Sequence, residues 1–159
     1  MSITLNDLTV NFKHLDRSAL LEDWQWMIGD HKLPVLITAM GTAFLQDTQD
    51  GTISLLDPGE GKLRQIAQSI EEFQQLLSDQ EFVLSEFLVE DFVSLRNGGK
   101  SLSHDQVFGF VQPPVLGGSF GVDNLEPTDM QVHFSLSGQI HRQVKDLPDG
   151  TPISNVSIS

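Results

Sequence analysis

Cysteine is absent from this sequence of 159 residues. Its absence excludes disulfides, thiolate chemistry and zinc sites built on cysteine ligands. Basic residues are scarce: 9 Lys and Arg face 22 Asp and Glu, which gives a net charge of −13. Because nucleic acids are bound through clustered Lys and Arg, and anionic membranes repel acidic surfaces, we expect no nucleic acid and no membrane as a partner. A partner with a basic surface fits this charge.

Long hydrophobic runs are also missing, since no stretch approaches the ~20 apolar residues that span a bilayer. The first residues show no basic region followed by an apolar stretch, so no secretory signal is visible and we expect a cytoplasmic protein. Hydrophobic residues make up 39% of the chain, which suffices for a core. We therefore expect a single domain over residues 1–159, with a short loose polar end at 155–159.

The spacing of apolar residues predicts helices mixed with strands. A helix is expected over 16–28, with Asp16 or Ser18 as its cap and Gly29 at its end. Two further helices should begin at capping boxes, Ser69 with Glu72 and Ser78 with Glu81, the second running to the glycines at 98–99. Strands are expected at 34–39, 41–46, 52–57 and 62–67, with a hairpin turn at 50–51. This order predicts an α+β fold with a mixed or antiparallel sheet and helices packed on it.

The C-terminal third is predicted to contain a strand at 107–111, an irregular Pro- and Gly-rich loop at 113–118, a strand around Val132 and Phe134, and a helix over 136–147. Trp24 and Trp26 lie within the first predicted helix. Two positions are ~200° apart on a helix, so these side chains should not share a face. One Trp is expected in the core, and Trp26 at the edge or at an interface.

Acidic residues dominate the segment 71–91, which holds seven carboxylates and no Lys or Arg. Helix capping and the helix dipole account for those at the two predicted helix starts. They leave Glu86, Glu90 and Asp91 unexplained, with Glu86 and Glu90 one helical turn apart. Two interpretations stay open: a solvated helix face, or a docking surface for a basic partner.

Residues 117–121 fit the Gly-x-Ser-x-Gly pattern, in which Ser119 would be the nucleophile of a hydrolase. That pattern needs a strand before the serine and a helix after it. Pro113 and Pro114 precede it, and 123–127 follow it as a loop, so a Gly-rich turn is favoured. A hydrolase using Ser119 with His133 or His141 remains the lesser alternative.

The five histidines give no metal-binding pattern. His133 and His141 are eight residues apart, unlike the i, i+4 pair of a zinc helix, and His14, His31 and His104 are isolated in polar stretches. We expect no metal and no cofactor. Rigid irregular loops often carry sites, so Pro114 and Gly117 could instead form a ligand pocket with His133 and His141.

Several segments together resemble one family. They are Trp24–Gly29, Leu33-Pro34, Gly41-x-Ala43-Phe44, Pro113–Gly118, Asn124, Val132–His141 and Leu147–Ile153. They resemble the C-terminal domain of the type VI secretion immunity proteins that neutralise a secreted DNase, a bacterial family often described only as a domain of unknown function. A more distant similarity is to the SUKH superfamily of immunity proteins, which implies a SUKH-like α+β fold.

The resemblance implies a non-catalytic binding protein that neutralises a cognate toxin, a nuclease, by direct contact, and it carries over no catalytic residue. A nuclease with a basic surface would complement the −13 charge. We predict that Glu86, Glu90 and Asp91 dock the partner and that Trp26 is an aromatic anchor. A ligand-binding or regulatory module is the alternative, and the oligomeric state stays open.

Overall fold

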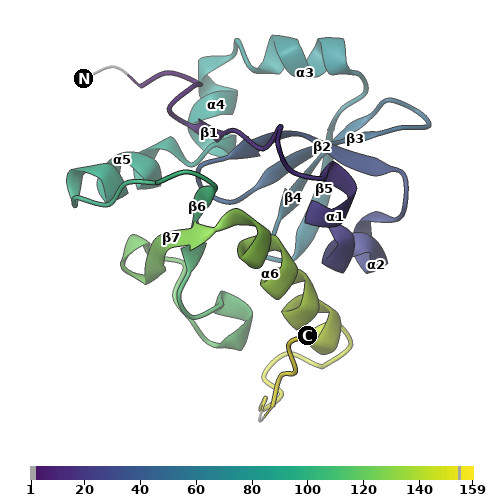
Figure 1. The fold of residues 1–159 in the computed structure, drawn as a ribbon, viewed down its shortest axis with the longest axis vertical. Coiled ribbons are helices and arrows are strands. Elements are labelled where there is room, and N and C mark those ends of the chain that lie inside the picture. The colour runs from purple at the N-terminus through teal and green to yellow at the C-terminus, as the bar shows by residue number, and fades with distance from the viewer. Residues whose placement is uncertain (1–2, 154) are drawn as a thin grey trace.

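An antiparallel sheet of five strands forms the centre of the fold (Figure 1). The computed structural model describes residues 3–153 and 155–159. The strands follow chain order across the sheet, so each pairs with its predecessor. They are β1 (Thr9–Val10), β2 (Lys32–Thr38), β3 (Ala43–Asp47), β4 (Ile53–Asp57) and β5 (Lys62–Ala67). The α+β prediction is confirmed, with the sheet antiparallel rather than mixed. A SUKH-like arrangement stays a prediction.

Side chains of the sheet alternate between two apolar clusters. Phe44 points into a cluster with Phe73, Phe87 and Phe92, which come from α3 (Ile70–Leu76), the residue after α4 (Gln80–Glu86), and α5 (Val89–Asn97). Its neighbours in β3, Ala43 and Leu45, point into a second cluster. Because successive residues of a strand face opposite sides, one strand serves both clusters. The sheet therefore has helices on both faces.

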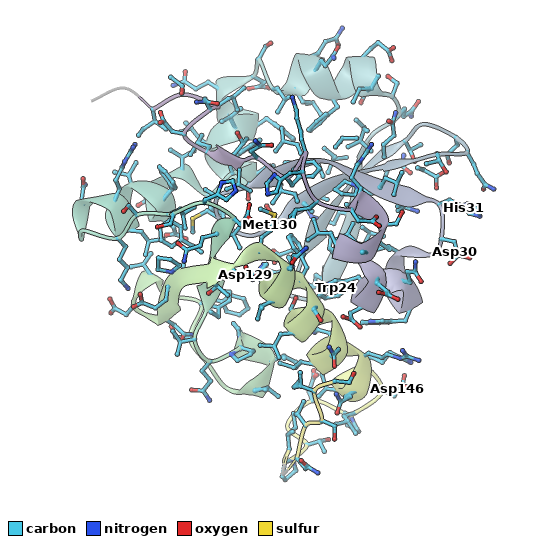
Figure 2. All side chains as sticks on the ribbon, in the orientation of Figure 1. Trp24, Asp30, His31, Asp129, Met130 and Asp146 are labelled. Atoms are coloured by element: carbon cyan, nitrogen blue, oxygen red, sulfur yellow. The ribbon has the colours of Figure 1, made fainter. Side chains whose placement is uncertain are left out.

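The second cluster joins the sheet to the first and last helices. It contains Trp24, which is fully buried, and Phe134 of α6 (Met130–Val144). Figure 2 shows Trp24 beside α6, where the N-terminal helical segment meets it. The long helix α6 is thus held against the sheet through apolar contacts along one side.

The helix predicted over 16–28 is broken into three short pieces. They are α1 (Arg17–Leu20), the 3-10 turn η1 (Glu22–Trp24) and α2 (Gln25–Ile28). The predicted ends are correct, because Asp16 caps the backbone N–H groups of Ser18 and Ala19, and Gly29 ends α2. The prediction that Trp24 and Trp26 face apart is wrong. Their rings stack with centroids 5.8 Å apart, since the chain between them is not one regular α-helix.

The helix predicted from Ser78 is also divided. Ser69 caps α3 as predicted, accepting from the N–H of Glu72 at 3.1 Å. The cap of α4 is Asp79 rather than Ser78, because the Asp79 carboxylate accepts from the next two free N–H groups. Leu88 then adopts a left-handed conformation, φ 52°, which ends α4 and starts α5 in a new direction.

The strand predicted around Val132 and Phe134 is wrong, because both residues lie in α6. Asp129 caps this helix by accepting from the N–H of Val132 at 3.0 Å. The sequence prediction missed β7 (Leu125–Asp129), which pairs with β6 (Gln106–Phe110) in a separate two-stranded sheet. Two 3-10 turns lie between these strands, η2 (Pro114–Leu116) and η3 (Val122–Asn124).

The end predicted to be loose is bound to α6. The Gln139 side chain accepts from the backbone N–H of Ser159 at 2.7 Å, and Gln143 accepts from that of Ser157 at 2.9 Å. Within the described residues, no helix is both long and apolar enough to cross a membrane. The single domain over 1–159 stays a prediction, and Met1, Ser2 and Ser154 within that range lie outside the described residues.

Candidate functional site

Two histidines of α6 contact two turns at one end of the central sheet. His133 Nε2 lies 2.8 Å from the carbonyl oxygen of Gly41, in the turn between β2 and β3. His141 Nε2 lies 2.9 Å from the carbonyl oxygen of Pro58, in the turn between β4 and β5. A carbonyl only accepts hydrogen bonds, so Nε2 carries the proton in both rings. The two histidines thus fasten α6 to this end of the sheet.

Burial disfavours the charged form of both imidazoles. Burial lowers the pKa of His133 below its ordinary value, and the hydrogen bond to Gly41 opposes this more weakly. Burial also lowers the pKa of His141, against the opposing effects of the Pro58 carbonyl and the Asp57 carboxylate. Because a charged ring is disfavoured and each Nε2 is already bonded, these histidines act as structural donors.

A small cavity separates α6 from the Pro-rich segment. Its volume is about 60 Å³, and its lining includes His133, His141 and Pro114, three of the four residues predicted for a ligand pocket; ligand binding there stays a prediction. Gly117, the fourth predicted residue, is not in the lining; it ends η2 with φ 100°.

A larger groove of about 280 Å³ adjoins the small cavity, and His133 lines both. It shares Pro58, Gly59, Phe110 and His133 with the small cavity. Leu88 and Phe120 add exposed apolar surface, with 40% and 57% of their area accessible. The Phe120 ring stands edge-on against Phe110, with centroids 5.7 Å apart. We call this hollow the Phe120 groove.

Carboxylates line the Phe120 groove beside its aromatic rings: Asp57, Glu60 and Asp91. Asp57 accepts from the N–H groups of Gly59 and Glu60, at 3.0 and 3.2 Å, and burial raises its pKa. Glu60 is exposed, with a 3.5 Å ion pair to Lys62, and exposed pairs of this kind are weak. Asp91 is half-buried in the first turn of α5. The groove thus combines aromatic walls with negative charge.

The three predicted docking carboxylates do not share one helix face. Glu86 lies at the end of α4 and forms a 2.6 Å ion pair with Arg64 of β5. Glu90 and Asp91 lie in the first turn of α5 beyond the break at Leu88, so the helix dipole does favour them. The idea of one continuous acidic helix face is therefore corrected. Of the three, Asp91 lines the Phe120 groove.

The predicted aromatic anchor, Trp26, is half-buried. Its indole Nε1 donates to the carbonyl oxygen of Gly138 at 3.2 Å, and its ring stacks on Trp24. The polar end of the side chain is therefore already bonded within the chain. A role for Trp26 in partner binding stays a prediction.

Ser119 does not stand in a nucleophile elbow. It lies between η2 and η3, not between a strand and a helix, and its Oγ accepts from the N–H of Gly121 at 2.8 Å. Among the residues that the structure describes, no hydrogen bond joins Ser119 to a histidine. The strand–turn–helix geometry of a nucleophile elbow is therefore not formed at Ser119.

The sequence analysis missed a cluster of His14, His104 and Asp105. The Nε2 atoms of His14 and His104 lie 2.6 and 3.3 Å from Asp105 Oδ1. The two imidazole rings are stacked, with centroids 5.0 Å apart. About 90 residues separate His14 from the other two, so no local spacing could have revealed the cluster.

Residues 67–141 match a family model described as the C-terminal part of the type VI secretion immunity protein Tdi1. This match confirms the family resemblance. The Tdi1-like segment, as we call these residues, is just under half of the chain and runs from the end of β5 into α6. It includes Leu88, Asp91 and Phe120 of the groove and both α6 histidines. The match supports a general role in neutralising a toxin, and no curated protein matches the chain.

Proposed function

We propose that this protein neutralises a type VI secretion toxin, a nuclease, by binding it directly through the Phe120 groove. The match of the Tdi1-like segment supports the immunity role. Nucleases hold phosphates with basic residues, and a chain with a net charge of −13 complements such a surface. On this proposal the protein is a stoichiometric inhibitor and performs no catalysis.

The observation that carries the proposal is the exposed Phe120 ring beside carboxylates. Aromatic side chains that enter a partner's pocket often dominate binding energy. More than half of the Phe120 surface is accessible, and Phe110 supports the ring from one side. Leu88 widens the apolar area, so an apolar stem can lie in the groove while its charged end reaches a carboxylate. A toxin loop with Arg or Lys has this chemistry.

Glu60 and Asp91 are the carboxylates of this chain that, on this proposal, contact basic residues of the toxin. Glu86 contributes less on this proposal, because Arg64 already compensates its charge. Glu90 is exposed and next to Asp91 in α5, so it adds to the same negative region. Asp57 has a positioning role, since its carboxylate holds the turn that carries Glu60.

The test uses a type VI secretion nuclease toxin, purified for binding measurements and co-expressed with this protein for growth measurements. The variant Phe120→Ala and the double variant Glu60→Lys/Asp91→Lys should each weaken binding by at least about tenfold. Both should also fail to restore growth of cells that produce the toxin. Melting temperatures of the free variants verify folding.

The matched control is Asp30→Lys/Asp146→Lys, which changes the net charge equally. Figure 2 shows both control residues at the periphery, away from α5. Its affinity should stay within about twofold of the wild type. Equal losses in both double variants would show that only overall charge matters, and unchanged binding by Phe120→Ala would exclude the groove. Absence of binding by the wild type would exclude direct neutralisation.

A further inference from the structure

Three potential metal ligands from distant parts of the chain lie at one place. His14 comes from the segment between β1 and α1, and His104 and Asp105 directly precede β6. One ligand atom from each of the three lies within 4.8 Å of the other two. This cluster lies outside the Phe120 groove, and the proposed toxin binding does not use it.

We propose that His14, His104 and Asp105 bind a divalent transition metal ion of the zinc type. Two imidazole nitrogens and one carboxylate oxygen suit Zn²⁺ and its neighbours in the first transition row. Mg²⁺ and Ca²⁺ prefer oxygen ligands, so this donor set disfavours them. Three protein ligands leave at least one coordination position for water.

The geometry is close to what a small ion requires. With metal–ligand distances of about 2.1 Å, the donors around a tetrahedral ion lie about 3.4 Å apart. The Nε2 atom of His14 lies 2.6 Å from Asp105 Oδ1 in hydrogen-bond geometry, and that of His104 lies 3.3 Å from the same oxygen. The His104 side chain is 78% exposed and that of His14 is 38% exposed, so small rotations can open the space that the ion needs.

The surroundings accept a cation. Arg96 and Lys100 line the hollow of about 390 Å³ that also holds His104 and Asp105, and each has a carboxylate within 4 Å. Arg96 lies 3.9 Å from Asp7, and Lys100 Nζ lies 3.0 Å from Glu126. The overall charge of −13 further favours cation entry through this open hollow.

The proposed ion would connect two separate parts of the fold. The carbonyl oxygen of Asp105 accepts from the N–H of Met130 at 2.8 Å. Met130, which Figure 2 labels, is the first residue of α6. His14 belongs to the segment that follows the edge strand β1. Because an ion that binds the folded state raises stability by mass action, Zn²⁺ should raise the melting temperature.

Calorimetric titration of the full chain with ZnCl₂ tests the proposal. We expect one site per chain with micromolar or tighter affinity, and Co²⁺ should give visible absorption bands when it replaces Zn²⁺. The variants His14→Ala, His104→Ala and Asp105→Asn should each weaken Zn²⁺ binding by at least about tenfold. Asn suits this position because Asp105 has φ 63°, which Asn tolerates.

The control variant is His31→Ala. His31 lies in the loop between α2 and β2, on the opposite side of the molecule from α5 (Figure 2). This variant should keep the affinity and the Zn²⁺-induced rise in melting temperature. Absence of one-site binding, or binding that all three ligand variants retain, would overturn the proposal. Neither outcome depends on the toxin.

Discussion

At the scale of single residues, the contact between α6 and the turn that joins β2 to β3 requires a glycine at position 41. Gly41 has φ 83°, and a Cβ there would lie 2.6 Å from His133 Nε2 and 2.9 Å from the Phe108 carbonyl oxygen. Gly41→Ala should therefore lower the free energy of unfolding by about 2–4 kcal/mol, from backbone strain and displacement of the histidine. Urea unfolding measures this loss.

The variant Gly51→Ala is the control for Gly41→Ala, because it has the backbone strain of a positive φ without the steric crowding of an added Cβ. Gly51 has φ 77°, but no atom lies within 4 Å of an added Cβ. This control should lose only about 1 kcal/mol, because it suffers the backbone strain alone. Similar losses in the two variants would mean that the approach of His133 to Gly41 adds nothing.

The pKa of His133 makes a second residue-scale prediction. Burial holds this pKa below 6.5, so the unfolded chain takes up a proton first when the pH falls. The free energy of unfolding is unaffected by this histidine above about pH 6.5 and decreases as the pH falls toward the folded pKa, by up to about 1.4 kcal/mol per pH unit. His141 acts in the same direction, whereas burial raises the pKa of Asp57 and opposes it at lower pH.

The comparison of wild type with His133→Gln isolates this effect. Gln can still donate to the Gly41 carbonyl but does not titrate. Urea unfolding from about pH 7.5 to about pH 5.5, a range that spans the ordinary histidine pKa, should show a shallower loss of stability in the variant. Parallel curves for the two proteins would contradict the assignment.

At the scale of secondary-structure elements, α6 approaches η1 so closely that only glycine fits at 138. A Cβ at Gly138 would lie 2.5 Å from the carbonyl oxygen of Asp23. Helix propensity alone predicts that Gly138→Ala stabilises by about 1 kcal/mol. Because the crowded atom belongs to the backbone, we expect the opposite, a loss of about 1–3 kcal/mol in chemical unfolding.

Val132→Ala is the control on the same helix. Val132 is 52% exposed, so its replacement leaves the contact with η1 intact. We expect a change within about 0.5 kcal/mol. A stabilising Gly138→Ala would show that the two elements can separate without cost.

The elements that were predicted well from the sequence are those with strong local signals. Asp50-Gly51 located the hairpin between β3 and β4, and Asp16 and Ser69 located two helix starts. The errors arose where tertiary contacts decide. Alternation of Val132 and Phe134 suits a strand, but Met130, Phe134 and Gly138 are all buried at a spacing of four, which is helical. Nothing local marks the left-handed Leu88, so two helices were predicted as one.

The candidate site was predictable in part. His133, His141 and Pro114 do line one cavity, because the Pro-rich loop lies next to the last helix. No local signal joins Asp57 and Glu60 with Asp91, since a strand and two helices separate them along the chain. Glu86 has a partner, Arg64, from the neighbouring sheet, and only the fold reveals it.

At the scale of the whole molecule, the charge of −13 should control how fast a basic toxin is bound. Long-range attraction raises association rates, and salt screens it over about 10 Å at 0.1 M and about 3 Å at 1 M. We expect the association rate constant with the toxin to fall about tenfold between about 0.1 and about 0.5 M NaCl, while dissociation changes little. Surface plasmon resonance measures both rates, and Phe120→Ala should change dissociation instead. An association rate that does not respond to salt would mean that apolar contact alone selects the partner.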